Sequence, residues 1–226
     1  MNTRGLLDQL LKSGQDLLQN KAAKPSGNQG SALSGLLSGA GGGALAAGAL
    51  GLLMGNKKAR KMGGTVLTYG GLAAVGVLAY KAWGNWQAQQ ATAPRGEAQT
   101  LDRVPEADVE AHSQAVLKAL VAAAKADGHV DARERELIEG EFSRLTPDPQ
   151  LREWLHAELN KPLDPKEVAR AAGTPEIAAE MYVASVMMVD DEHFMERAYL
   201  DELARQLSLD AGLKIELERQ VKQANV

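Results

Sequence analysis

The sequence of 226 residues contains no cysteine, and its aromatic residues are limited to two Phe, three Trp and four Tyr. The absence of cysteine excludes a disulfide framework, a Cys-ligated zinc site and a thiol nucleophile. Acidic residues are scarce up to Gln90, where two acidic and nine basic side chains give a net charge of +7. Beyond Gln90, 27 acidic and 16 basic side chains give a net charge of −11. One uniform globular fold over the whole chain is therefore not expected.

Residues 1–30 are predicted to form an amphipathic N-terminal helix followed by a linker. Leucines recur at helical spacing between residues 2 and 20, with charged side chains between them. Only two basic side chains, Arg4 and Lys12, are available for lipid head groups. This helix is therefore expected either to lie on a membrane surface or to dock on the body of the protein.

Residues 31–86 are predicted to form a glycine-rich hydrophobic region that associates with a membrane through one or two spans. Small residues occupy every fourth position in its first part: Ser31, Gly35, Gly39, Gly43, Ala47, Gly51 and Gly55. This glycine stripe would give a helix a smooth face that another backbone can approach closely. We expect the stripe to support association with the second apolar segment or with another copy of the chain, and the region as a whole to contact membrane lipid. The alternative is a disordered Gly/Ala tether.

The run Met62–Tyr80 is the best candidate for a transmembrane helix. It has no charged residue, its length just spans a bilayer core, and Lys81, Trp83 and Trp86 follow it as an interfacial belt. The alternative is a buried helix of a water-soluble domain. Lys57, Lys58, Arg60 and Lys61 precede the run, and the positive-inside rule would keep them in the cytoplasm. A single span would then place the C-terminal domain in the periplasm, and a hairpin that also uses Leu33–Met54 would place it on the same side.

Residues 87–106 are predicted to be a linker, and residues 107–226 an all-α domain of about seven helices. Apolar residues recur with helical period from Val109 onward, and no alternating strand pattern occurs. Asp164 before Pro165 and Thr174 before Pro175 are start signals of helices. The expected helices cover about 107–126, 131–145, 149–159, 164–172, 176–189, 192–207 and 210–224.

A weak internal repeat places an acidic turn after an apolar helix in each half of this domain. Each copy has an early Asp, a second carboxylate, a nearby His (His129 or His193) and a Glu in the next helix. Oxygen ligands of this kind suit Ca²⁺ or Mg²⁺, and the imidazoles suit Zn²⁺. The candidate metal ligands are Asp127, Asp131, Glu134, Asp190, Glu192 and Glu196. The alternative is that these carboxylates only cap helices.

The runs Ala-Asp-Gly-His-Val-Asp-Ala-Arg-Glu-Arg (126–135) and Glu-Arg-Ala-Tyr-Leu-Asp-Glu-Leu (196–203) resemble the TerB-like domain of the tellurite-resistance family. With its glycine-rich N-terminal half, the chain looks like uncharacterised bacterial inner-membrane proteins of the YebE type. The resemblance implies a seven-helix fold with pseudo-symmetric halves and an acidic surface near the Asp-Gly turns that binds a divalent metal. It implies no established enzymatic activity. Asp191 stands where the family pattern has a Gly, so the second copy fits less well.

No catalytic motif accompanies these features. The sequence has no nucleophile elbow, phosphate-binding loop or His-Glu-x-x-His motif. The net charge of −11 beyond Gln90 opposes nucleic-acid binding, which requires a basic face. We therefore expect a bacterial inner-membrane protein whose helical domain binds an unknown protein partner or a cation and is not an enzyme. The alternative is a metal-dependent hydrolase that uses Asp127, Asp131 and Glu134.

Overall fold

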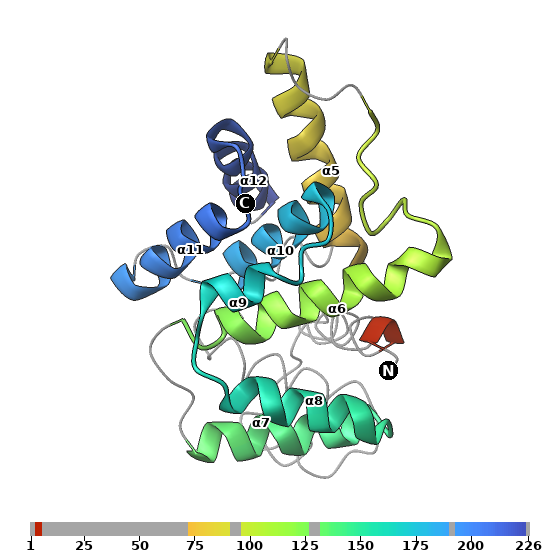
Figure 1. Cartoon of the computed structure of the whole chain (residues 1–226), viewed down its shortest axis with the longest axis vertical. Helices are drawn as coiled ribbons and strands as arrows, with labels where there is room; N and C mark the ends of the chain where they lie inside the picture. Colours follow the sequence, from red (N-terminus) through yellow and green to blue (C-terminus); the bar gives the residue numbers. More distant parts are fainter. Residues whose placement is uncertain (1–2, 6–71, 91–95, 127–131, 190–192, 225–226) are drawn as a thin grey trace, which may run out of the picture.

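The computed structural model describes residues 3–5, 72–90, 96–126, 132–189 and 193–224 (Figure 1). Every regular element in these ranges is a helix and none is a strand, which confirms the predicted all-α class. The helices are α5 (Leu72–Gln89), α6 (Glu106–Ala123), α7 (Ala132–Leu145), α8 (Pro149–Asn160), α9 (Pro165–Ala169), α10 (Pro175–Met188), α11 (Phe194–Gln206) and α12 (Ala211–Ala224).

Three helices begin where local sequence signals place their starts. The Asp148 carboxylate accepts the Gln150 and Leu151 amides at 2.9 and 3.3 Å. Asp164 accepts the Lys166 amide at 2.9 Å, and Thr174 Oγ1 accepts the Ile177 amide at 3.2 Å. Each cap is followed by a proline at the first helical position, where the missing N–H costs nothing. The capping predictions for α9 and α10 are confirmed.

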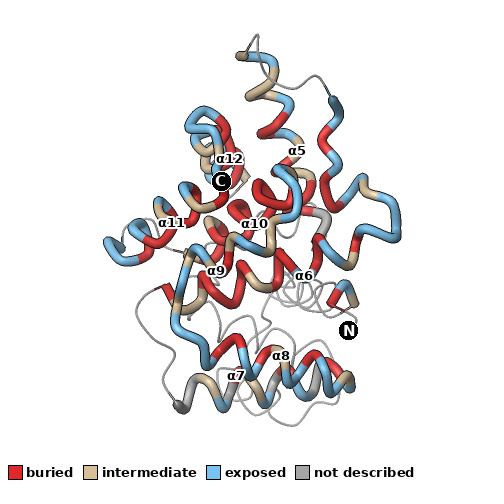
Figure 2. The backbone as a smooth tube through the Cα atoms, in the orientation of Figure 1, coloured by how far each residue is buried: buried red, intermediate tan, exposed pale blue. Residues whose placement is uncertain are grey.

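Helix α10 is the centre of the fold. It contacts α5, α6, α11 and α12, and its middle residues are buried on every side (Figure 2). Met181, Tyr182 and Val183 have no exposed surface. A helix that is apolar all round requires this surrounded position, because no face of it is suited to water. Helices α7 and α8 pair with each other beside α6, farther from α10.

Helix α5 is a core element of the same bundle. It packs along α12 and against α10, and buries Val75, Leu78 and Trp83 to 7% exposure or less. This helix holds the second half of the candidate span Met62–Tyr80. No helix in the ranges that the structure describes is long and apolar enough to cross a membrane. The transmembrane helix is therefore not supported, and the seven-helix count is not confirmed because α5 shares the core of the helices that follow it.

The tryptophans that resemble an interfacial belt instead join α5 to α12. The Trp86 indole N–H donates to Asp210 Oδ1 at 2.8 Å, and the Trp83 and Trp86 rings stack edge to face with centroids 5.4 Å apart. Asn85, directly before Trp86, donates from Nδ2 to Glu216 Oε1 at 2.7 Å. An amphipathic aromatic ring with a polar tip serves a helix contact as well as a membrane interface.

The segment before α6, predicted as a linker, rests on α5 and α10. Thr100 and Leu101 are buried, and the Leu101 amide donates to the Glu180 carboxylate of α10. A Cβ added at Gly76 of α5 would lie 2.6 Å from Asp102 Oδ1 and 2.8 Å from the Asp102 amide nitrogen. Close approach of this turn to α5 therefore requires glycine at position 76.

Candidate functional site

The predicted metal ligands lie mostly outside the described residues. Asp127, Asp131, Asp190 and Glu192 fall in undescribed ranges, and of Glu134 only the position on α7 is described. Glu196 lies in the first turn of α11 and is 1% exposed. Among the described residues, no group of three or more His, Asp or Glu side chains could hold a metal ion. The metal site therefore stays a prediction.

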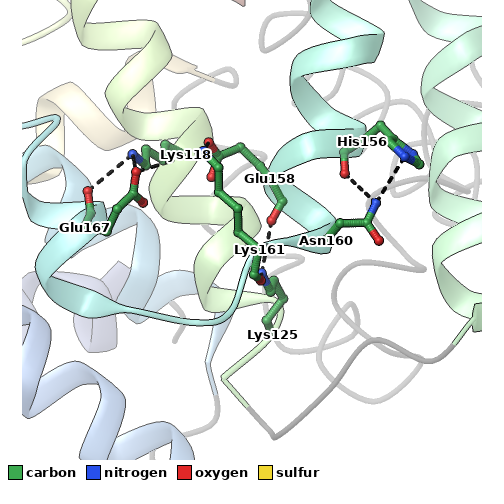
Figure 3. Close-up of polar contacts among 7 residues, drawn as sticks. All are labelled: Lys118, Lys125, His156, Glu158, Asn160, Lys161 and Glu167. Carbon is green, nitrogen blue, oxygen red and sulfur yellow. Dashed lines mark hydrogen bonds and ion pairs between the residues drawn. The ribbon is translucent and has the colours of Figure 1, made fainter.

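A lysine cluster borders the first acidic turn. Lys125 stands two residues before Asp127, and its Nζ donates to the Glu158 carbonyl at 3.0 Å and to the Lys161 carbonyl, at the end of α8 (Figure 3). The free carbonyls of a helix C-terminus carry partial negative charge and favour an ammonium group there. Lys125 therefore ties the end of α6 to the end of α8.

Two further lysines complete this cluster. Lys118 Nζ donates to Glu167 Oε1 at 2.8 Å and joins α6 to α9, and Lys161 Nζ lies 2.5 Å from Glu158 Oε1 (Figure 3). The hydrogen bond from Lys118 lowers the pKa of the Glu167 carboxyl, and the one to Glu158 raises the pKa of Lys161. Each charge in the cluster thus has a partner, which fits a structural junction of three helices.

Two cations flank the first acidic turn in the sequence. Burial lowers the pKa of the Lys125 ammonium; Glu158 opposes that shift and Arg135 of α7 adds to it as a like charge. Lys125 and Arg135 stand on the two sides of residues 127–131 in the sequence. The carboxylates of the turn itself lie outside the described residues.

The most buried ionisable pair among the described residues joins α6 to α10. His112 Nδ1 lies 2.6 Å from Glu180 Oε2, and the two side chains are 5% and 0% exposed. The other Glu180 oxygen accepts the Leu101 amide. Burial raises the pKa of Glu180, while His112 and the Leu101 amide act in the opposite direction. Because both partners are enclosed among helices, the pair orders the core and offers no open side to a substrate.

Sequence reasoning missed this pair, although a signal for it was present. Glu180 is the one charged residue between Ile177 and Val189 in an otherwise apolar helix. A lone carboxylate on a helix that is buried all round must find a hydrogen-bond partner, since an unpaired buried charge is strongly unfavourable. The sequence does not give the partner, because His112 is 68 residues away. The other described histidines lie apart, His156 beside Glu139 at 2.7 Å and His193 exposed before α11.

Exposed apolar side chains gather at the start of α11. Phe194 is 83% exposed and the adjacent Met195 is 58% exposed. Ile215 of α12, at 64%, is the third large hydrophobic side chain that is exposed within the described ranges. Two such side chains in sequence, directly after the second acidic turn, form an apolar pair that water solvates poorly.

Comparison with known proteins places this chain among relatives of unknown activity. The model of the family described as "Protein of unknown function (DUF533)" matches residues 39–221. The chain belongs to this family. It is also similar to a Yersinia enterocolitica protein described as "Uncharacterized protein in ampR 5'region", with 32% identity over 117 residues, 52% of this chain and 84% of that protein. No solved structure matches the chain. The matched range includes α5 together with α6 to α11 and most of α12, in agreement with one shared core.

Proposed function

We propose that this member of the DUF533 family is a helical binding module that a glycine-rich N-terminal region holds at a membrane. The single observation that carries the binding role is the exposed pair Phe194 and Met195 on α11. Large apolar side chains of this kind are typical anchors of protein interfaces, since their burial by a partner releases ordered water. The proposed partner is a protein with an apolar pocket for the Phe194 ring.

The polar junctions favour a binding module over an enzyme. His112 and Glu180 are enclosed in the core, and the lysines near α8 are engaged by carboxylates or carbonyls. The chemistry of these groups is used in holding helices together. A TerB-like relationship and an inner-membrane location belong to the same proposal, and rest on the repeated acidic turns and the glycine stripe.

Cation binding is a second part of the proposal and concerns the carboxylates Asp127, Asp131, Glu134, Asp190, Glu192 and Glu196. Lys125 and Arg135 flank the first turn in the sequence, and like charges repel. We therefore expect Ca²⁺, Mg²⁺ or Zn²⁺ to bind there only weakly. The alternative function is a metal-dependent hydrolase at Asp127, Asp131 and Glu134. Turnover of a phosphoester or peptide panel by the full chain with added metal, abolished by Asp127→Asn, would favour that alternative.

The partner role is tested with a photo-crosslinking amino acid placed at position 194 of the full chain in living cells. We expect a discrete protein adduct whose yield falls strongly when Met195 is also changed to Ser, because the two side chains would share one pocket. The matched control is the same crosslinker at position 215, which is similarly exposed on another helix. Equal adducts from both positions would mean that any exposed apolar side chain is captured, and the binding role of α11 would be rejected.

A further inference from the structure

Helix α11 carries an exposed stripe along its outer side. Four residues that share this side are exposed, and they make up the α11 stripe: Phe194, Ala198, Asp201 and Arg205. At 3.6 residues per turn they fall within an arc of about 60° around the helix axis. The opposite side is buried and holds Tyr199, Leu200 and Leu203. Figure 2 shows α11 at the edge of the bundle, so the stripe faces away from the core.

The charged residues of the α11 stripe are held in place by neighbours in the same chain. Arg205 Nε and Nη2 donate to the two carboxylate oxygens of Glu202 at 2.9 and 2.5 Å. This fork fixes the guanidinium plane, and a planar guanidinium can still stack on an aromatic ring. Asp201 Oδ1 accepts Lys214 Nζ of α12 at 2.9 Å, and 61% of the Asp201 side chain stays exposed. Both groups therefore keep surface for a further partner.

The order of these residues makes the outer side of α11 complementary to itself in the antiparallel direction. When two copies of a helix meet around a two-fold axis, positions equally far before and after the axis face each other. With the axis beside Tyr199, Arg197 lies two positions before it and Asp201 two positions after it. Each Arg197 would then meet the Asp201 of the other copy, and this ion pair would form twice. Phe194, at the start of the stripe, would meet the Arg205 end of the second copy.

We propose that α11 is a contact between two copies of this chain, in which the exposed pair Phe194 and Met195 binds the second copy. This inference rests on the binding role proposed above and names the partner. The Phe194 ring packs on the Ala198 methyl group and on the guanidinium face and methylene stem of Arg205 in the second copy. The small Ala198 beside the axis lets the two backbones approach closely. Because two short helices bury less area than an obligate dimer interface, the association is weak and depends on concentration.

The contact is tested by disulfide formation in the purified full chain, which has no cysteine of its own. In Ala198→Cys the two thiols lie beside the two-fold axis, within the reach of a disulfide. We therefore expect mild oxidation to give a covalent dimer in high yield. Ala157→Cys is the matched control, since it replaces an exposed alanine on α8. Equal dimer yields from the two positions would overturn the inference.

Charge reversal in the Ala198→Cys chain tests the antiparallel register. Arg197→Asp and Asp201→Arg should each lower the dimer yield roughly tenfold, because like charges then face each other twice. The two reversals together should restore the yield, since the ion pair forms again with opposite polarity. Lys214→Gln removes the same contact of Asp201 within the chain and should leave the yield near its starting value. A double reversal that dimerises no better than the single ones would overturn the inference.

The photo-crosslinker at position 194 separates this inference from the proposed function. An adduct between two copies of the chain supports both. An adduct with a different protein supports the binding role of α11 and overturns the second copy as its partner. The absence of any adduct from position 194 overturns both.

Discussion

Glu180 and His112 show how one buried contact constrains three parts of the chain. The carboxylate binds the imidazole of α6 with one oxygen and the Leu101 amide with the other, while its own backbone belongs to α10. Such a pair costs desolvation energy, and removal of one partner leaves the other buried without compensation. The pair therefore specifies how α6, α10 and the turn before α6 fit together more than it adds net stability.

The first prediction follows from the raised pKa of Glu180. A carboxyl whose pKa is higher in the folded state stabilises the fold below its unfolded value, and this contribution is lost as pH rises through the folded value. The unfolding free energy of the native chain should therefore fall, relative to that of Glu180→Gln, as pH rises above 4.5, the ordinary value of the group. Urea unfolding at several pH values between 4.5 and 7.5 measures this difference.

The control for this prediction is Glu153→Gln, which removes an exposed carboxyl from α8. Its difference from the native chain should vary little over the same pH range. A Glu180→Gln difference that is flat with pH would mean that the carboxyl is not penalised by burial. Glu180→Leu should destabilise the fold at every pH by about 3–5 kcal/mol, since the Leu101 amide and the imidazole both lose their partner.

Among the helices, prediction from sequence succeeded where the signals are local. Residues 149–160, 165–169 and 175–188 begin with a capping side chain and a proline, which act within three positions of the helix start. The helix 72–89 was assigned to a membrane because an apolar run with tryptophans at its end has the same pattern in a bilayer and in a protein core. Only the contacts with α10 and α12, far along the chain, distinguish the two.

The site residues show the same limit. The acidic turns were visible because their carboxylates are close in sequence, whereas the lysine cluster joins Lys118 and Lys125 to residues more than 30 positions away. The pair Phe194 and Met195 was not singled out, because an apolar residue near the start of an amphipathic helix is normally taken as part of its buried face. Exposure is set by the rotation of the helix on the core, and the sequence alone leaves that rotation open.

The second prediction compares two glycines of α5. Gly76→Ala should destabilise the fold, because the added methyl meets the Asp102 backbone nitrogen at 2.8 Å and the turn must move away. Gly84 has open space at its Cβ position, so Gly84→Ala should stabilise the fold by about 0.8–1 kcal/mol through helix propensity. Thermal melts of the two variants and the native chain measure the effects. Shifts of the same sign would show that Gly76 does not face a tight contact.

At the scale of the whole molecule, the folded unit includes α5. The bundle that sequence reasoning begins at residue 107 also requires Val75, Leu78, Ala79, Ala82 and Trp83 from the preceding helix. Without them, the apolar surfaces of α10 and α12 would face water. A domain of this size is stabilised by only roughly 5–15 kcal/mol in total, so the loss of one core helix is comparable with the whole unfolding free energy.

The third prediction tests the contribution of α5 to the core. A chain of residues 72–226 should unfold cooperatively in urea. The unfolding should change tryptophan fluorescence as it does in the full chain, because the Trp83 and Trp86 pair is still present. A chain of residues 100–226 should lose the cooperative transition and bind a hydrophobic dye such as ANS. Trp154 remains in both chains and serves as the internal reference. If residues 100–226 unfold at the same urea concentration as residues 72–226, then α5 is a peripheral element.

The contact between Trp86 and Asp210 also sets an order of events during synthesis. The two residues are 124 positions apart, and α12 is the last helix within the described residues. At roughly 5–20 residues per second, α5 waits about 6–25 seconds on the ribosome before its partner exists. During that interval the apolar face of α5 has no folded α12 to cover it. Whatever receives the nascent chain therefore meets the apolar face of α5 first, and the bundle closes only after α12 has been made.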